Sequence, residues 1–259
     1  MTTVNGGEPT LISRLDPAEL ARVCLVATDV DGTLTRGGKL DPGVLAAIRR
    51  LVDAGITVVP VSGRPAGEVA GLVRYLPGVW RGLAENGLLE IVPDRAPRWL
   101  VAPTDRGRLH RVGAELNAAG AGLRLTGDDF CRLGDVAYER DGRDEATLLD
   151  LRAAAEAHGV HLVWSNVHIH LAYAVPDKGL ALLQLVRELS VAPERVATIG
   201  DAPNDAGLFR SGRFGLTVGT ADVLPQRAYF PELPRAVTAG GETDGFLELA
   251  ELLLAARGA

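Results

Sequence analysis

Residues 23–35 read Val-Cys-Leu-Val-Ala-Thr-Asp-Val-Asp-Gly-Thr-Leu-Thr, an apolar run that ends in an acidic turn. A continuous apolar run of this kind is typical of a strand buried on both faces of a parallel sheet. Residues i and i+2 of an extended segment project to the same side, so Asp29 and Asp31 bring two carboxyl groups to one point. Gly32 allows the backbone to turn sharply there. The stretch predicts the first core strand with paired carboxyl groups at its end.

The segments on either side of this strand predict a doubly wound α/β fold. Asp41 caps and Pro42 begins a helix that reaches residue 54, a strand follows at 56–61, and a second helix follows at 66–75. Strand, helix, strand order indicates a parallel sheet with a right-handed crossover. The same order returns late in the chain, with a helix at 179–189, a strand at 195–199, a helix at 204–210 and a strand at 214–218. We expect both ends of the chain to build one parallel, Rossmann-like sheet.

The middle of the chain has a different pattern and predicts a separate α+β insert. Its expected strands are residues 87–92, 123–126, 136–140, 162–164 and 167–174, and its expected helices are residues 104–119 and 144–158. We therefore predict a flexible N-terminal tail at 1–20, a core made of 21–87 and 176–259, and an insert at 88–175.

Composition and charge exclude several classes of protein. The 259 residues are 47% hydrophobic and carry a formal net charge of −6, which argues against a nucleic-acid binder with a basic surface. The two cysteines have no metal-ligand spacing. Neither a secretory signal nor an apolar run of the ~20 residues that a membrane helix needs is evident. We expect a cytoplasmic protein without a membrane or nucleic-acid partner, either a monomer or a homodimer.

Three further segments place polar groups at the carboxyl ends of predicted strands or at the start of a helix, where ligands of such sheets bind. Ser62-Gly63-Arg64-Pro65 follows the second strand, and its hydroxyl and N–H groups are suited to phosphate oxygens. Lys178 begins a helix whose dipole disfavours a cation, which makes sense if an anion is bound. A second acidic turn, at residues 199–205, follows a later strand.

These groups are suited to phosphoryl transfer. One carboxylate of the Asp29/Asp31 pair could attack phosphorus to give an aspartyl phosphate, while the other exchanges a proton with the leaving oxygen and with water. Mg²⁺ is held octahedrally by one or two carboxylates together with water and substrate oxygens, and Asp201 supplies a further carboxylate. The sequence predicts a magnesium-dependent enzyme that acts on a small phosphorylated metabolite.

The ordered motifs Asp29-x-Asp31-Gly32-Thr33, Ser62-Gly63-Arg64, Lys178 and Gly200-Asp201-x-x-Asn204-Asp205 resemble those of the haloacid-dehalogenase-like (HAD) phosphatases. Glu85-Asn86-Gly87 resembles a fifth motif, found in subclass IIB, which includes Cof-type enzymes and sucrose phosphatase. Members of that subclass carry an α/β cap where residues 88–175 fall. The resemblance covers nearly the whole chain after Arg22.

The resemblance implies roles for the core residues. Asp29 would be the nucleophile and a magnesium ligand, and Asp31 would be the general acid/base and bind the metal through its backbone carbonyl. Ser62, Gly63 and Lys178 would hold the phosphoryl group.

The fourth motif completes the implied metal site. Asp201 would be the remaining direct protein ligand, and Asn204 and Asp205 would support the metal, its waters or Lys178. One departure is that Gly219-Thr220-Ala221 stands where many relatives have Gly-Asn-Ala, so a polar contact from that asparagine is in doubt.

Specificity is expected to depend on the cap and on the core side chains that face it. The candidate substrate contacts are Arg64, Asn86, Arg132, His168 and His170. The two histidines alone do not supply the three or four ligands of a zinc site. Alternatives to a phosphatase are a phosphosugar mutase or phosphotransferase, and a phospho-acceptor signalling domain, which would lack a cap-sized insert. A non-catalytic binding protein is disfavoured because both Asp29 and Asp31 are present.

Overall fold

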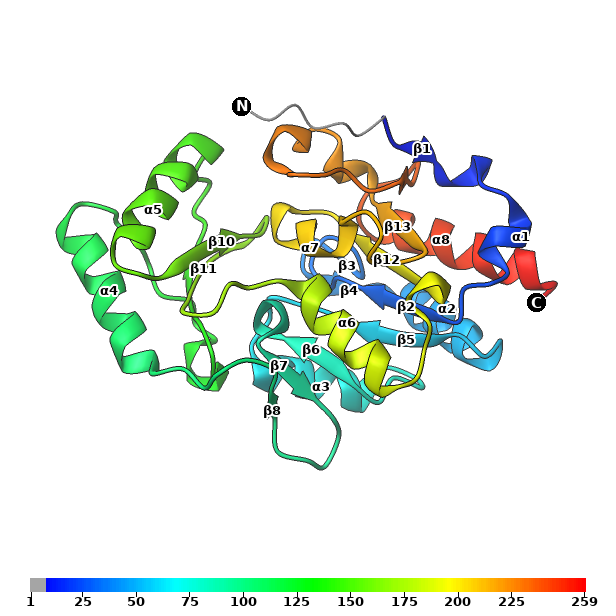
Figure 1. The fold of residues 1–259 in the computed structure, drawn as a ribbon, viewed down its shortest axis with the longest axis horizontal. Helices are drawn as coiled ribbons and strands as arrows, with labels where there is room; N and C mark the ends of the chain where they lie inside the picture. The colour runs from blue at the N-terminus through cyan, green and yellow to red at the C-terminus, as the bar shows by residue number, and fades with distance from the viewer. Residues whose placement is uncertain (1–7) are drawn as a thin grey trace.

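A central parallel sheet organises the computed structural model, which describes residues 8–259. Its strand order is β1-β14-β13-β12-β2-β5, and each neighbouring pair is parallel. The strands are β1 (Thr10–Leu11), β14 (Ala236–Val237), β13 (Leu216–Gly219), β12 (Val196–Gly200), β2 (Leu25–Thr28) and β5 (Thr57–Pro60). All four residues of β2 are buried, as its apolar run predicts. The predicted Rossmann-like sheet, built from both ends of the chain, is confirmed (Figure 1).

Helices cover both faces of this sheet. Val26 of β2 packs with α2 (Pro42–Asp53), α3 (Ala66–Tyr75) and α8 (Glu242–Arg257). Leu25 and Ala27, which point to the other side, pack with α6 (Lys178–Glu188) and α7 (Ala206–Phe209). Figure 1 shows α6 in front of the strands and α8 behind them. Within residues 8–259, no helix has both the length and the apolar character needed to cross a membrane.

A second lobe is built by the middle of the chain and appears in green in Figure 1. Its antiparallel sheet has the order β10-β11-β9, and α4 and α5 pack with this sheet. The elements are α4 (Arg106–Ala118), β9 (Val136–Glu139), α5 (Glu145–Ala157), β10 (His161–Trp164) and β11 (His168–Ala172). Its buried cluster runs from Leu109 to Ile169 and Leu171 and contains no residue of the central sheet. The predicted cap fold is confirmed, and this lobe is called the cap below.

The segment after the third core strand differs from the sequence expectation. Strands β6 (Gly82–Ala84), β7 (Leu89–Ile91) and β8 (Arg98–Trp99) form an antiparallel sheet, and Leu89 and Ile91 belong to the core cluster. Residues 88–99, expected in the insert, therefore pack with the core. A short hairpin of β3 (Thr35–Arg36) and β4 (Lys39–Leu40) follows the acidic turn of β2.

Two local predictions were wrong. The expected strand at 123–126 is reduced to one bridge between Leu125 and Tyr138. At its start, the Asn117 side chain bonds both backbone groups of Leu123, at 2.9 and 2.5 Å, so Leu123 pairs with a side chain and not with a strand. The helix expected at 204–210 is shorter than predicted. Only α7 (Ala206–Phe209) is α-helical, because residues 203–205 form a separate 3-10 turn.

The N-terminal segment also differs from the expected tail. Residues 1–7 lie outside the described part of the chain, but Thr10–Leu11 adds strand β1 to the sheet edge and Pro17–Leu20 forms helix α1. The Asp16 side chain caps α1 by accepting a bond from Ala18 N. Ile12 is fully buried in the core cluster. A two-residue strand is too short to show a periodic pattern, so the sequence did not reveal it.

Ile12→Ala is expected to lower the free energy of unfolding by about 2–4 kcal/mol, because it opens a cavity in a packed core. Leu11→Ala, at a side chain that is already exposed, is the matched control and is expected to cost well under 1 kcal/mol. Chemical denaturation of both variants measures the difference. Equal effects would mean that residues 10–14 do not contribute to the core.

Candidate active site

Three neighbouring strands bring the predicted polar residues to one edge of the sheet. Strands β12, β2 and β5 are parallel neighbours, so their carboxyl ends lie side by side. Asp201 follows β12, Asp29 follows β2, and Ser62 lies just beyond β5. All three residues are buried.

Lys178 lies at the centre of this group. Its Nζ donates to Asp29 Oδ1 and to Asp205 Oδ1, both at 2.6 Å, and the three residues are almost completely buried. Burial alone would lower the pKa of Lys178, but Asp205 and Asp29 raise it above its ordinary value. Lys178 is the first residue of α6, where the helix dipole opposes a positive charge. The two carboxylates therefore keep the ammonium charged and fix its position.

The carboxylates around Lys178 form a compact acidic cluster. Asp29, Asp201 and Asp205 each offer an oxygen, and these atoms all lie within 4.8 Å of one another. Burial, followed by the charge of Asp205, raises the pKa of Asp29 to about 7. Burial, with Asp29 and Asp205, also raises the pKa of Asp201 well above its usual range. One buried ammonium is thus too little positive charge for three buried carboxylates.

The two acidic turns pack directly against each other. Gly32 has a φ of +81°, and a Cβ atom there would collide with Asp201 Oδ2, so the close approach requires glycine. Asp201 accepts a bond from Thr33 Oγ1 at 3.1 Å. Asp205 turns back and accepts the N–H of Asp201 at 2.9 Å. Asp201 is thereby held beside the first motif, whereas Asp205 braces the loop and Lys178.

Asp31 is paired with Arg64 at the edge of the buried cluster. The guanidinium donates from Nε and Nη2 to the two oxygens of Asp31 at 2.6 and 2.7 Å, and from Nη1 to Glu68 at 3.0 Å. The side chains of Asp31 and Arg64 are only 16% and 24% exposed, so this bidentate pair is shielded from water.

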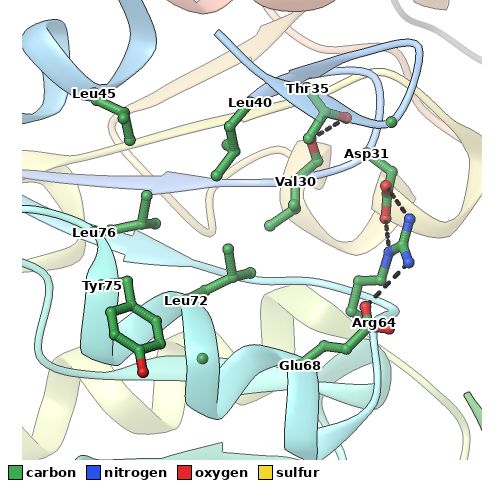
Figure 2. Close-up of a pocket in the computed structure, with 12 residues that line it drawn as sticks. Val30, Asp31, Thr35, Leu40, Leu45, Arg64, Glu68, Leu72, Tyr75 and Leu76 are labelled. Atoms are coloured by element: carbon green, nitrogen blue, oxygen red, sulfur yellow. Dashed lines mark hydrogen bonds and ion pairs between the residues drawn. The ribbon is translucent and has the colours of Figure 1, made fainter. Parts of the chain in front are cut away.

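The Asp31–Arg64 pair lines two adjoining cavities. One, of about 620 Å³, also has Asn166 and Asp201 in its wall. The other, of about 440 Å³, is mostly apolar (Figure 2). Its apolar lining is made by the side chains of Val30, Leu40, Leu45, Leu72, Tyr75 and Leu76.

Asn86 and Asn204 form a polar pair beside the Ser62–Arg64 loop. Asn86 has a φ of +56° and is buried, and its Oδ1 accepts a bond from Asn204 Nδ2 at 3.0 Å. Within the described residues, Asn86 Nδ2 and Asn204 Oδ1 have no hydrogen-bond partner. A Cβ atom on Gly63 would lie 3.2 Å from the Asn86 amide. The unpaired amide nitrogen of Asn86 is therefore close to the Ser62–Arg64 loop.

The candidate cap residues have partners within the protein. Arg132 is buried and bonded to Asp128 and Asp135, and His170 Nδ1 lies 2.8 Å from Asp135. Burial, followed by His170, lowers the pKa of His168 to about 4. Burial and Arg132 hold the pKa of His170 well below its usual range. Both histidines are therefore neutral near pH 7 and offer no positive charge to an anion.

Asn166 is a polar contact that the sequence did not reveal. It lies in the turn between β10 and β11, and its Nδ2 donates to Asp201 Oδ2 at 2.5 Å. This bond joins the tip of the cap to the acidic cluster of the core. A single asparagine in a Ser-Asn turn is an ordinary turn residue, so no sequence signal distinguished it.

The arrangement defines a class of protein: a capped α/β enzyme whose site is built from clustered carboxylates and one buried ammonium. The model of the haloacid dehalogenase-like hydrolase family matches residues 26–87 and 152–226, and the chain belongs to this family. The predicted family and the phosphatase class are confirmed, and the predicted capped fold is shared by solved structures.

Curated relatives match over nearly their whole length. A protein of Methanoculleus marisnigri named phosphoglycolate phosphatase is 32% identical over 231 residues, covering 86% of this chain and 93% of the relative. One of the same name from Natronomonas pharaonis is 33% identical over 230 residues, covering 87% and 96%.

Solved structures share the fold at lower identity. The Thermoplasma acidophilum 0175 protein has a TM-score of 0.73 at 22% identity and covers 89% of this chain and 99% of its own. A sucrose-phosphatase from Synechocystis, solved with sucrose and phosphate, has a TM-score of 0.63 at 18% identity and covers 88% and 97%. These likenesses concern the fold alone.

Proposed function

We propose that this protein hydrolyses the phosphate monoester of a small metabolite, with phosphoglycolate as the first substrate to test. The observation that carries the proposal is the buried contact of Lys178 with Asp29 and Asp205 at the carboxyl edge of the sheet. A fixed cation beside a carboxylate nucleophile suits a phosphoryl group. The substrate class is suggested by the relatives that bear the name phosphoglycolate phosphatase.

The proposed reaction has two steps. The Asp29 carboxylate attacks phosphorus and forms an aspartyl phosphate, while Asp31 gives a proton to the departing ester oxygen. Asp31 then takes a proton from water, which attacks the aspartyl phosphate and releases inorganic phosphate. Lys178 and the Ser62–Arg64 loop hold the phosphoryl oxygens throughout.

Arg64 has to release one oxygen of Asp31 before this proton transfer. Both oxygens accept bonds from the guanidinium, so neither is free to donate a proton in this geometry. Glu68 is close enough to Arg64 to keep the guanidinium paired when the contact with Asp31 is broken. We therefore infer that substrate entry shifts Arg64 from Asp31.

The site fits a magnesium ion. Three buried carboxylates lie in a cluster with one ammonium, and burial, together with repulsion between the carboxylates, raises the pKa values of Asp29 and Asp201. Asp29, Asp201 and the backbone carbonyl of Asp31 would hold the ion, and Asn204 and Asp205 would support it. When bound, Mg²⁺ would offset the charge of the phosphoryl oxygens.

We also propose a division of labour between the lobes. The phosphoryl-transfer residues lie in the core, whereas the cap tip and the rim of the larger cavity contact the rest of the substrate. Arg64 and Asn166, which line this cavity, are the proposed specificity contacts, whereas His168 is buried and lines neither of the two adjoining cavities. Because residues 88–99 pack with the core, the cap that selects substrate is shorter than the 88–175 insert.

The experiment is a screen of phosphate esters with detection of released phosphate. Phosphoglycolate, hexose phosphates and p-nitrophenyl phosphate are compared at equal concentration. Repeated turnover on phosphoglycolate supports the proposal. One alcohol released per protein, with the phosphoryl group kept on the protein and no free phosphate, would favour a phospho-acceptor domain. Transfer of the phosphoryl group to a second position of the sugar would favour a mutase.

Removal of the metal is expected to abolish turnover. Excess chelator should stop hydrolysis of p-nitrophenyl phosphate, Mg²⁺ should restore it, and Ca²⁺ should inhibit, because calcium prefers more ligands and longer bonds. A second measurement does not depend on activity: Mg²⁺ should raise the Tm, since it binds the folded state alone. Full activity in chelator would contradict the prediction.

A further inference from the structure

We propose that Glu85 and Arg132 form a fixed joint between the cap and the Ser62–Arg64 loop, and that both are positioning residues for phosphoryl binding. The inference rests on the proposed function, because it assigns the phosphoryl group to that loop. The cap–loop joint consists of Gly63, Glu85, Arg132, Asp135 and His170. In this joint Arg132 and His170 hold the cap against the loop, whereas the sequence predicted that they contact the substrate.

Glu85 ties the core to the cap through four backbone N–H groups. Its Oε1 accepts from Ala66 of the core at 3.0 Å and from Leu133 of the cap at 2.9 Å. Its Oε2 accepts from Gly134 and Asp135 at 2.5 and 3.0 Å. Glu85 is fully buried. Moving the cap away here would leave a buried carboxylate and several N–H groups without partners, which is costly.

Arg132 reaches from the cap to the loop itself. Its Nη1 donates to the Gly63 carbonyl at 3.1 Å and to Asp135 Oδ1 at 3.0 Å. Its Nε and Nη2 donate to the two oxygens of Asp128, both at 2.9 Å. The side chain has no exposed surface. A guanidinium enclosed by two carboxylates and a carbonyl is a structural brace and is not free to receive a substrate.

The joint and the neighbouring Asn86 backbone together account for every carbonyl of the Ser62–Arg64 loop. Ser62 O accepts from Asn86 N at 2.9 Å, Gly63 O from Arg132, and Arg64 O from Glu85 N at 3.0 Å. The peptide plane between Gly63 and Arg64 is thereby fixed, and the Arg64 N–H on it donates to Ser62 Oγ at 3.0 Å. The joint therefore controls the orientation of the Ser62 hydroxyl, which is proposed to hold phosphate.

His170 closes the joint against Gly63. Its Nδ1 lies 2.8 Å from Asp135 Oδ2, and because that carboxylate also accepts from Arg132, the imidazole is the donor. Its Nε2 would lie 3.2 Å from a Cβ atom on Gly63. The missing side chain at Gly63 thus lets the cap pack directly on the phosphate loop.

The test compares substitutions in the joint with a matched one elsewhere in the cap. Arg132→Met removes the brace, Arg132→Lys restores the charge, and Glu85→Gln puts an amide NH₂ opposite two N–H donors. Arg140→Met is the control, because Arg140 is a half-buried cap arginine bonded only to cap residues. The measurements are kcat/KM for phosphoglycolate and p-nitrophenyl phosphate, the inhibition constant of inorganic phosphate, and Tm.

We expect Arg132→Met and Glu85→Gln to lower kcat/KM about 10- to 100-fold on both esters by the same factor, the size of effect seen when the support of a site is removed. Inhibition by inorganic phosphate should weaken in parallel, Arg132→Lys should recover part of both losses, and Arg140→Met should change neither by more than about twofold. A loss confined to phosphoglycolate would make Arg132 a substrate contact and overturn the inference. Unchanged kinetics with a lower Tm would reduce the joint to a folding element and also overturn it.

Failure of the proposed function is distinguishable from failure of the joint. If the parent protein hydrolysed neither ester, the phosphatase proposal would fail. Calorimetric binding of inorganic phosphate to the parent, to Arg132→Lys and to Glu85→Gln would still test the joint. Weaker phosphate binding in the two variants supports it, and equal binding contradicts it.

Discussion

Replacing Asp29 by asparagine is expected to lower kcat at least about 10⁴-fold, which corresponds to more than about 5 kcal/mol of barrier. The amide is a poor nucleophile, so the aspartyl phosphate should not form and turnover should be lost. The fold should persist, because asparagine has the same shape and Lys178 keeps its 2.6 Å contact with Asp205. Since burial already raises the pKa of Asp29 to about 7, a neutral group at this position should not lower the Tm.

The measurement combines turnover, thermal unfolding and a search for a phosphorylated peptide containing residue 29 after acid quench. Asp53→Asn, at an exposed aspartate, is the control for the amide substitution and should behave as the parent. A turnover rate within about tenfold of the parent would exclude Asp29 as the nucleophile. Loss of the phosphopeptide with a normal Tm is the expected result.

The sheet and the central cluster could be predicted because parallel strands place their carboxyl ends together. The apolar runs before Asp29, Ser62 and Asp201 identify three strands, and their adjacency in the sheet brings these residues to one edge. Lys178 was noted because a cation at a helix start is unfavourable without an anion, and the structure places two carboxylates beside it. Their grouping follows from topology, whereas their catalytic roles remain predictions.

Contacts between the lobes could not be predicted in the same way. Arg132 and Gly63 are 69 residues apart, and Asn166 and Asp201 are 35 apart. Such pairs depend on how the cap docks on the core, which local patterns do not encode. A buried arginine braced by Asp128 and Asp135 has the same sequence signal as an exposed one that binds an anion. The sequence therefore identified Arg132 as a polar candidate but not its partner.

The boundaries of the cap could not be predicted from the sequence pattern either. Strand β7 alternates like the strands of the cap, yet Leu89 and Ile91 are buried in the core cluster. The helix α8 at residues 242–257 and strand β14 were not identified, although α8 packs on α2 and completes one face of the sheet. Only tertiary packing assigns such segments to a lobe.

Replacing Lys178 by methionine is expected to lower the free energy of unfolding by about 3–5 kcal/mol, the usual cost of removing one partner from a buried ion pair. Methionine is similar in length, but Asp29 and Asp205 lose the only ammonium that contacts them among the described residues, and Asp201 lies within the same acidic cluster. Lys39, the only other lysine of the chain, is exposed, and Lys39→Met is the matched control. Turnover should be lost in Lys178→Met and kept in Lys39→Met.

The charge explanation is separated from a packing defect by adding Asp205→Asn to Lys178→Met. The amide oxygen of asparagine can still accept the N–H groups of Asp201 and Ala202, so the loop is kept while one buried charge is removed. Most of the lost Tm should therefore return in the double variant, although turnover should not. Mg²⁺ should also raise the Tm of Lys178→Met more than that of the parent, because the ion would replace the missing positive charge. The measurement is thermal unfolding of the parent, Lys39→Met, Lys178→Met and the double variant, in chelator and in Mg²⁺. If neither Asp205→Asn nor Mg²⁺ raises the Tm of Lys178→Met, the loss is one of packing, and the acidic cluster does not depend on a balancing cation.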